Sequence, residues 1–449
     1  MPNQYDILIK NGTCLLPDSS ESHLVETRSD IGIKDGKIIA IQANLTGTAS
    51  RTIDAIGKHV LPGVIDSQVH FREPGLTHKE DLETGTRAAV LGGVTTVFEM
   101  PNTNPPTTTQ AAFQEKLDLA KNRAHSNYAF FIGGSHDNVS ELANLERLQH
   151  CSGIKIFMGS STGTLLVEDD ATLEKILQHG SRRVIFHSED EMRLRERKHI
   201  AEESGDVHDH PIWRDVMTAT QSTERLLRLA RKTGRKIHVL HISTGEEMDL
   251  LKDAKDIATV EVLPQHLTLY APDCYDRLGT LAQQNPPIRE KRHLKRIWQA
   301  VQDGTADVIG SDHAPHTLEE KARPYPQSPS GVPGVQTLVP LMLNFVNEGK
   351  IPLTRFAEMV TLNPVKTFGI LNKGILKESF DADITIVDMS ITKTISNAWI
   401  ASRSPWTPFD GMEVKGWMTH TIVNGKVVME NDQVVLPHQG QPVFFKDCQ

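Results

Sequence analysis

The chain has 449 residues, of which 38% are hydrophobic and 23% are charged, so it can bury a large core and is neither disordered nor fibrous. Lysine and arginine number 48 against 57 aspartate and glutamate residues, a formal net charge of −9. Because the sequence also lacks a basic run, this balance argues against nucleic acid as a partner.

The first residues lack the layout of a signal peptide, and no apolar stretch reaches the roughly 18 residues that a membrane span requires. These features predict a cytoplasmic protein without membrane segments. The cysteines are far apart and form no CxxC pair, which predicts reduced thiols rather than disulfides or a thiolate zinc site; they are Cys14, Cys151, Cys274 and Cys448.

The two ends of the chain share one pattern. Residues 5–60 and 382–436 contain short alternating strands with Asn-Gly or Asp-Gly turns, which are typical of β-hairpins. Each end alone is too small for a good core. We therefore expect both termini to form one small β-sandwich domain, made of residues 1–60 plus 370–449.

Eight apolar runs rich in Val, Ile and Phe follow one another through the middle of the chain, separated by amphipathic segments of helical period. Alternating units of this kind predict a parallel sheet covered by helices, and eight of them predict a (β/α)8 TIM barrel over residues 61–369. The runs are His59 to His70, Val94 to Met100, Tyr128 to Gly133, Gly153 to Met158, Arg183 to His187, Lys236 to His241, Thr259 to Pro264, and Ala306 to Asp312.

A Pro/Gly/Ser-rich segment, Ala322 to Gly334, follows the eighth run closely. Long loops at the C-terminal face of a barrel are more often functional than mere linkers. We expect this loop to close over a bound substrate.

Potential metal ligands stand at the ends of several predicted strands. A single histidine there is usually structural, but the carboxyl ends of barrel strands meet at one mouth, so joint placement favours a metal site. Imidazole and carboxylate without thiolate suit Zn²⁺ or a similar divalent ion. The candidates are His70, Lys155, His187, His241 and Asp312.

Lys155 is unusual because it lies inside the apolar run from Gly153 to Met158. A buried ammonium needs a carboxylate partner or a lowered pKa. Carbamylation by CO2 is the alternative, since it would turn the amine into an anionic ligand that can bridge two cations. His238 faces the other side of its strand from His241 and is expected to be a packing residue.

In order, the runs LPGVIDSQVHFREPG, MPNTNPPT, IKIFMGSSTG, FHSED, HVLHIST and GSDHAPH resemble the amidohydrolase superfamily, and within it the dihydroorotase family. The resemblance implies that a carbamylated Lys155 with His70, His187 and His241 holds the metal centre, and that Asp312 binds metal and moves the proton. It also implies a set of substrate-binding residues, namely Arg72, Asn102, Asn285 and His316.

One position departs from the family pattern. The first strand of the family usually reads His-x-His, whereas here Gln68 stands in the first place and only His70 remains. Both side chains share one face of the strand, but an amide oxygen is a weaker zinc ligand than imidazole. We expect one firm Zn²⁺ and a weaker second ion.

The resemblance implies reversible cyclisation of N-carbamoyl-L-aspartate to L-dihydroorotate in pyrimidine biosynthesis, and it implies that the protein is a homodimer. Two alternatives stay open. One is another cyclic amidase, such as hydantoinase, dihydropyrimidinase or allantoinase. The other is a non-catalytic homologue that acts as a structural partner of aspartate transcarbamoylase, which Gln68 alone favours.

Overall fold

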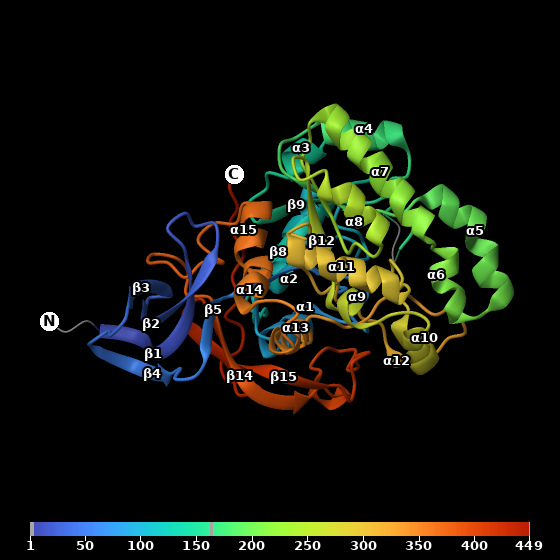
Figure 1. Ribbon diagram of the computed structural model, residues 1–449. Coiled ribbons are helices and arrows are strands. Elements are labelled where there is room, and N and C mark those ends of the chain that lie inside the picture. The colour runs from blue at the N-terminus through green and yellow to red at the C-terminus, as the bar shows by residue number, and fades with distance from the viewer. Residues whose placement is uncertain (1–3, 162–164, 449) are drawn as a thin grey trace.

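The computed structural model describes residues 4–161 and 165–448, which form two sheets and their covering helices (Figure 1). One sheet contains eight parallel strands and the other contains nine strands from both ends of the chain. The fold class predicted from the sequence, a (β/α)8 barrel with a β-structure built from both termini, is therefore confirmed.

The barrel strands follow chain order around the sheet, so each is the neighbour of the next. The first and last strands meet where Val69 bridges His313 and the His70 amide donates to the His313 carbonyl at 2.7 Å. This contact closes the barrel at its C-terminal rim. The strands are β6 (Val64–Val69), β7 (Val94–Glu99), β8 (Asn127–Gly133), β9 (Cys151–Phe157), β10 (Val184–His187), β11 (Ile237–Val239), β12 (Ala258–Val262) and β13 (Val308–Ile309).

Helices surround the barrel, and those that follow its first strands are α1 (Leu82–Leu91), α2 (Gln110–Ala120), α3 (Leu142–Leu145) and α4 (Asp170–Gln178). The shortest of these is α3, with four residues. The connection after β10 is the longest and contains α5 (Glu191–Ser204), α6 (His210–Trp213) and α7 (Val216–Thr233). Later helices are α8 (Gly245–Lys252), α9 (Pro264–Thr268), α10 (Asp273–Leu278), α11 (Lys291–Asp303), α12 (Leu318–Lys321), α13 (Leu338–Asn347), α14 (Leu353–Val360) and α15 (Leu362–Phe368).

The second sheet lies beside the barrel and joins the two termini, because β5 from the N-terminal part pairs antiparallel with β14 from the C-terminal part (Figure 1). The predicted run from His59 to His70 is thus two strands, one in each sheet. The members of this sheet are β1 (Gln4–Pro17), β2 (Leu24–Lys34), β3 (Lys37–Gln42), β4 (Thr48–Asp54), β5 (His59–Pro62), β14 (Ile384–Thr394), β15 (Glu413–Val423), β16 (Lys426–Glu430) and β17 (Gln433–Val434).

The chain after β17 leaves this sheet and packs against the barrel. Pro442 bridges Tyr128 of β8, and the rings of Phe445 and Phe98 lie 5.4 Å apart. Val443 and Phe445 join a buried cluster with residues of β6, β7, β8 and β10 and with Leu240 and Phe368. The C-terminal tail therefore completes part of the barrel core.

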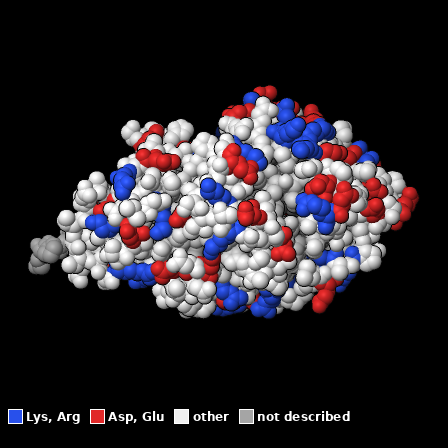
Figure 2. Space-filling model, turned by 60° about the horizontal axis from the view of Figure 1, so that its bottom comes forward, with Lys and Arg blue, Asp and Glu red and all other residues white. Residues whose placement is uncertain are grey.

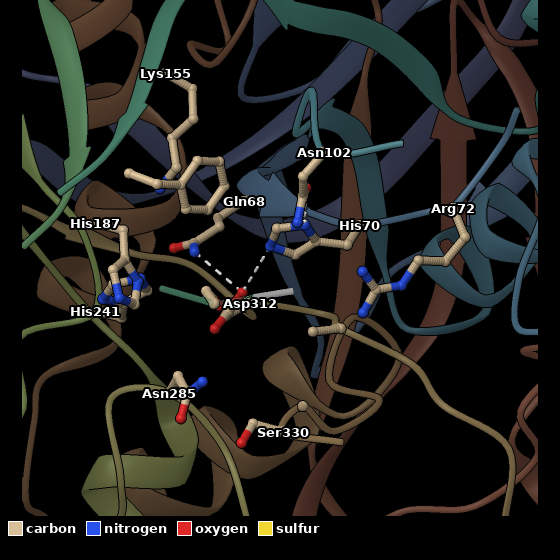
Figure 3. A pocket seen from close by; sticks show the side chains of 14 residues that line it. Gln68, His70, Arg72, Asn102, Lys155, His187, His241, Asn285, Asp312 and Ser330 are labelled. Carbon is tan, nitrogen blue, oxygen red and sulfur yellow. Dashed lines mark hydrogen bonds and ion pairs between the residues drawn. The ribbon is translucent and has the colours of Figure 1, made fainter. Parts of the chain in front are cut away.

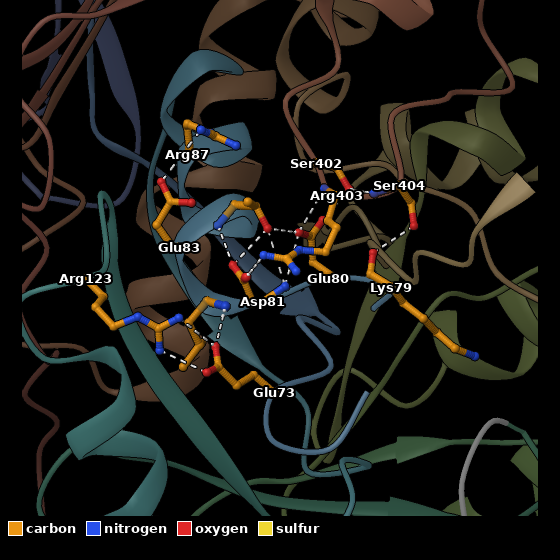
Figure 4. A network of polar contacts seen from close by, with 12 residues as sticks. Glu73, Lys79, Glu80, Asp81, Glu83, Arg87, Arg123, Ser402, Arg403 and Ser404 are labelled. Atoms are coloured by element: carbon orange, nitrogen blue, oxygen red, sulfur yellow. Dashed lines mark hydrogen bonds and ion pairs between the residues drawn. The ribbon is translucent and has the colours of Figure 1, made fainter. Parts of the chain in front are cut away.

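A polar network ties the segment before β15 to the barrel (Figure 4). Glu80, which is fully buried, accepts hydrogen bonds from the Arg403 amide at 3.1 Å and from the Ser402 hydroxyl. Glu80 also lies 3.1 Å from His313 Nε2 and accepts hydrogen bonds from the Asp81 amide at 3.2 Å and from the Thr84 hydroxyl, while Arg403 forms an ion pair with Asp81, the N-cap of α1. Glu80 thus links the start of α1, the segment before β15 and the residue that follows Asp312.

On the face shown in Figure 2, Lys and Arg residues are interspersed with Asp and Glu. All four cysteines are free. Within residues 4–161 and 165–448, no helix combines the length and apolar character needed to cross a membrane.

We predict that Glu80→Ala destabilises the protein by about 3 kcal/mol or more, because it leaves buried donors on His313, Ser402 and Arg403 without an acceptor. The thermal unfolding midpoint should fall by several degrees. Glu115→Ala, at an exposed position of α2, is the matched control and should leave the midpoint unchanged. Equal midpoints for the two variants would contradict this role of Glu80.

Candidate active site

A pocket opens at the C-terminal rim of the barrel, where the predicted site residues converge (Figure 3). All of them except His316 line it. The lining residues are Gln68, His70, Arg72, Asn102, Lys155, Phe157, Ser161, His187, His241, Asn285, Asp312, Ala314, Ser330 and Gly331.

Asp312 occupies the centre of the pocket (Figure 3). Its Oδ1 lies 3.1 Å from His70 Nε2 and accepts a hydrogen bond from Gln68 Nε2 at 3.0 Å. Burial alone would raise the pKa of Asp312, but the hydrogen bond with His70 and the neighbouring His70, His241 and Lys155 hold it well below its usual value. Asp312 is therefore a carboxylate, able to accept a proton or bind a cation.

His187 and His241 form a second pair. His187 Nδ1 lies 3.1 Å from His241 Nε2, while His187 Nε2 lies 2.9 Å from Glu189 Oε2. Glu189 is fully buried and paired with Arg214; burial would raise its pKa, but the charge of Arg214 and the hydrogen bond with His187 lower it. Because this carboxylate can only accept, His187 donates from Nε2 and presents the lone pair of Nδ1 to His241.

Two pairs of side chains, His70 with Asp312 and His187 with His241, have the chemistry of ligands for a divalent cation. Burial lowers the pKa of His70, His187 and His241, which keeps the imidazoles neutral, the form that binds metal. Two nitrogen ligands of one tetrahedral zinc lie about 3.3 Å apart, close to the spacing of His187 and His241. Among the described residues, Gln68 Oε1 and His241 Nδ1 are buried without a hydrogen-bond partner.

The pairs do not merge into one cluster, however. In the part of the chain that the structure describes, no three His, Cys, Asp or Glu side chains come close enough together to hold a metal ion. Any such ion would need a further ligand from another kind of residue. Lys155 lies in the same pocket and is the residue that could supply it.

Lys155 is 1% exposed, and its ammonium group lies 4.4 Å from the centre of the Phe157 ring. Burial lowers the pKa of Lys155 to about 7, although the charges of Asp312 and Glu261 oppose this shift. A large fraction of the side chain is therefore the neutral amine near neutral pH. The neutral amine is the nucleophilic form.

Arg72 lies on the side of Asp312 opposite His187 and His241, and it is 1% exposed (Figure 3). Its Nε donates to the Pro315 carbonyl at 3.3 Å, but Nη1 has no hydrogen-bond partner among the described residues. Burial lowers the pKa of Arg72 to about 10, against the opposing charges of Asp312 and Glu99. A buried guanidinium with a free edge in a pocket is suited to bind an anionic ligand.

Three site residues have left-handed backbone conformations: Arg72 with φ 65°, His241 with φ 40° and Asp312 with φ 44°. Residues with a Cβ rarely adopt these angles, and such positions are concentrated at active sites. Here the conformation redirects the chain directly after a barrel strand. It thereby aims the side chain at the mouth of the barrel.

His316 is the one predicted site residue that does not line the pocket. It is fully buried behind Arg72, with Nε2 3.4 Å from Arg72 Nη2 and 3.1 Å from the Ser330 carbonyl oxygen. Lys79 Nζ lies 3.1 Å from its Nδ1. In this structure His316 contacts Arg72 and the loop that carries Ser330.

The two predicted asparagines contact other site residues. Asn102 Oδ1 lies 2.7 Å from His70 Nδ1, a contact that helps to fix the imidazole ring. Asn285 Oδ1 lies 3.0 Å from Nε2 of the buried His210. Both amides are therefore held from behind and present polar groups to the pocket.

Several lining residues were missed by the sequence analysis. Ser330 and Gly331 belong to the predicted loop 322–334, so the composition of that segment was a signal, but it did not single them out. Phe157 and Ser161 lie in the IKIFMGSSTG run, which was used for the family resemblance but did not single them out. Glu189 lies in the FHSED run, and a carboxylate two residues after a ligand-like histidine could have suggested its orienting role.

Known proteins resemble this chain over nearly its whole length. The model of the amidohydrolase family matches residues 59–428. The chain is 35% identical to a dihydroorotase from Methanosarcina mazei over 452 aligned residues, covering 97% of both chains. The chain belongs to the amidohydrolase family.

Relatives in this family carry more than one name. An L-hydantoinase from Paenarthrobacter aurescens is 34% identical over 449 aligned residues, covering 96% of each chain. A solved structure of L-hydantoinase (dihydropyrimidinase) from Arthrobacter aurescens superposes with a TM-score of 0.92 at 31% identity, covering 98% of this chain and 100% of that one. The amidohydrolase described here is a hydrolase of cyclic amides.

We predict that Arg72→Met raises the thermal midpoint of the metal-free protein, by the equivalent of about 1–3 kcal/mol, because it removes a buried charge that forms no direct ion pair with a carboxylate among the described residues. Arg235→Met is the contrasting control, since Arg235 forms a buried ion pair with Glu146. That variant should unfold at a lower temperature than wild type. A lower midpoint for Arg72→Met would show that the Arg72 charge is compensated in the free protein.

Proposed function

We propose that this amidohydrolase is a dihydroorotase, which interconverts N-carbamoyl-L-aspartate and L-dihydroorotate. The observation that carries the proposal is the buried guanidinium of Arg72, whose Nη1 has no partner among the described residues and which lines the pocket. Dihydroorotate has a carboxylate beside its cyclic amide, whereas hydantoin and dihydrouracil have none. A carboxylate bound to Arg72 would neutralise the guanidinium and orient the ring.

We further propose that Lys155 is carbamylated and holds Zn²⁺ together with His187 and His241. The lowered pKa of Lys155 supports this, because CO2 reacts with a neutral amine. A second, weaker ion would use His70, Asp312 and the amide oxygen of Gln68. When bound, a divalent ion supplies Lewis acidity, which polarises the amide carbonyl group and makes water acidic enough to attack near neutral pH.

Asp312 is proposed as the proton carrier. It is ionised, buried and central in the pocket, so it can accept the proton that the attacking water loses. As the amide C–N bond breaks, the same carboxyl group returns that proton to the departing ring nitrogen. In the cyclisation direction the steps are reversed and water leaves.

The remaining pocket residues are proposed to position the substrate. Arg72 and Asn102 would bind the carboxylate, with His316 holding Arg72 from behind. Asn285 would approach the ring from the opposite wall. Fixed orientation of this kind lowers the barrier because the entropy of alignment is lost on binding.

A second candidate function is hydantoinase or dihydropyrimidinase activity, which is supported by the likeness to the Arthrobacter aurescens structure. Allantoinase belongs to the same class of reaction. These activities act on rings without the carboxylate, so they would leave Arg72 without a binding role. The substrate comparison below separates them.

We predict that the wild-type protein hydrolyses dihydroorotate at least about thirtyfold more efficiently, in kcat/KM, than hydantoin, dihydrouracil or allantoin. Arg72→Gln should lose this preference because it removes the charged pair with the carboxylate. Arg277→Gln, at an exposed arginine of α10, is the matched control and should keep it. Preferential turnover of a ring without a carboxylate would overturn the proposed substrate.

Gln68→His tests the weaker metal position. Metal content measured by inductively coupled plasma mass spectrometry should rise from about one toward about two ions per chain, because imidazole is a stronger zinc ligand than an amide oxygen. Gln110→His adds a histidine at an exposed position and should leave the content unchanged. Equal metal content in wild type and Gln68→His would show that Gln68 does not limit this position.

The third candidate, a non-catalytic partner of aspartate transcarbamoylase, is tested by the same preparations. Protein from zinc-supplemented growth that contains no metal and hydrolyses none of the four rings would favour it. Association with aspartate transcarbamoylase and assembly as a homodimer stay predictions.

A further inference from the structure

A second buried lysine lies behind the pocket wall. Lys321, the last residue of α12, is fully buried. Its ammonium group donates to three backbone carbonyl oxygens: Gln283 at 2.9 Å, Pro329 at 2.9 Å and Gly331 at 3.1 Å. The ammonium thus binds three carbonyl groups much as a small cation would.

The charge of Lys321 is compensated in an unusual way. Burial lowers the pKa of Lys321, and no acidic side chain of the described residues opposes this shift, so the charged form rests on the three carbonyl acceptors. Its nearest aromatic contact is the Trp406 ring, 5.7 Å away. Since a buried ammonium is costly without good partners, the three carbonyl bonds are the main compensation that the structure provides.

These carbonyl groups belong to the two loops that form one wall of the pocket. Gln283 lies two residues before Asn285, and Gly331 lines the pocket together with Ser330. The Gly331 amide also donates to the Gln283 carbonyl at 2.9 Å, so the two loops meet at the ammonium group. The position of this wall therefore depends on a contact that lies outside the pocket.

The loop that forms this wall also contacts the part of the pocket around Arg72. The Ser330 carbonyl oxygen lies 3.1 Å from His316 Nε2, and that nitrogen lies 3.4 Å from Arg72 Nη2. Displacement of the loop at Ser330 would change the support of Arg72 as well as the wall that carries Asn285. None of these contacts involves His187, His241 or Lys155.

We propose that Lys321 is a positioning residue for substrate binding, whose ammonium group locks the loops 279–287 and 322–334 together so that Asn285, Ser330 and Gly331 form a preordered wall facing Arg72. The residue does not touch the substrate. Its effect belongs to substrate affinity rather than to the chemical step, because the proton carrier and the candidate metal ligands are held by other contacts. The kinetic test described below rests on the proposed dihydroorotase function, whereas the test by hydrogen–deuterium exchange does not.

The test compares Lys321→Met and Lys321→Gln with wild type, in protein purified with its metal. Lys321→Met removes all three donated hydrogen bonds and should raise the KM for dihydroorotate about tenfold or more, with kcat within about threefold of wild type. Lys321→Gln keeps an NH2 group that can donate to some of the three carbonyl groups, so it should give an intermediate KM. Lys252→Met, at an exposed lysine paired with Asp303, is the matched control and should leave KM unchanged.

Hydrogen–deuterium exchange followed by mass spectrometry supplies the second readout. Exchange in Lys321→Met should increase in peptides covering 279–287 and 322–334, while peptides covering β9 and β10 stay as in wild type. If Lys321→Met does not fold, Lys321→Gln decides by the same two measurements. An unchanged KM with unchanged exchange, or a loss confined to kcat, would overturn the proposal.

The two proposals fail separately. If dihydroorotate is not a substrate, KM is measured with whichever ring the wild-type protein hydrolyses, and the exchange comparison is unaffected. Increased loop exchange without any rise in KM would show that Lys321 has a structural role alone, which also overturns the proposal.

Discussion

The site depends on the closure of the barrel between β6 and β13. Parallel strands all end at the same rim, but in an open sheet the first and last strands would lie at opposite edges. The bridge between Val69 and His313 and the hydrogen bond from the His70 amide bring these edges together. As a result His70 and Asp312, 242 residues apart in sequence, lie 3.1 Å from each other. Without this closure the two halves of the pocket would not face one another.

Three buried basic side chains that form no ion pair with a carboxylate among the described residues lie in or behind the pocket at this rim, and each is accommodated differently. Lys321 binds three carbonyl groups, Lys155 has a strongly lowered pKa, and Arg72 keeps a nitrogen without a partner among the described residues. A protein selected for stability alone would replace such groups with apolar ones of similar size. Their presence at one pocket indicates that this part of the fold is built for ligands, at some cost to stability.

Substrate choice in this family must depend on few side chains. Relatives named dihydroorotase and L-hydantoinase are similar to this chain to nearly the same degree, and both align over almost its whole length. The barrel and its rim are therefore compatible with several cyclic amides. Under the proposed function, Arg72 carries the distinction, because it would bind the carboxylate that the other rings lack.

The sequence by itself determined the local features. The alternation of apolar runs and amphipathic segments predicted the barrel, and polar residues at strand ends predicted His70, Lys155, His187, His241 and Asp312 in one pocket, because side-chain direction along a strand follows from its period of two. It did not separate β5 from β6, because what divides these two strands is their different partners in space.

Tertiary structure decided what depends on contacts across the barrel. It arranged the histidines and Asp312 as two pairs, placed His316 behind Arg72, and joined the loops around Lys321 through backbone carbonyl groups. Carbonyl groups are the same in every residue, so no sequence pattern marks the ones that will bind a buried ammonium. Such contacts are set by the path of the loops once the barrel has closed.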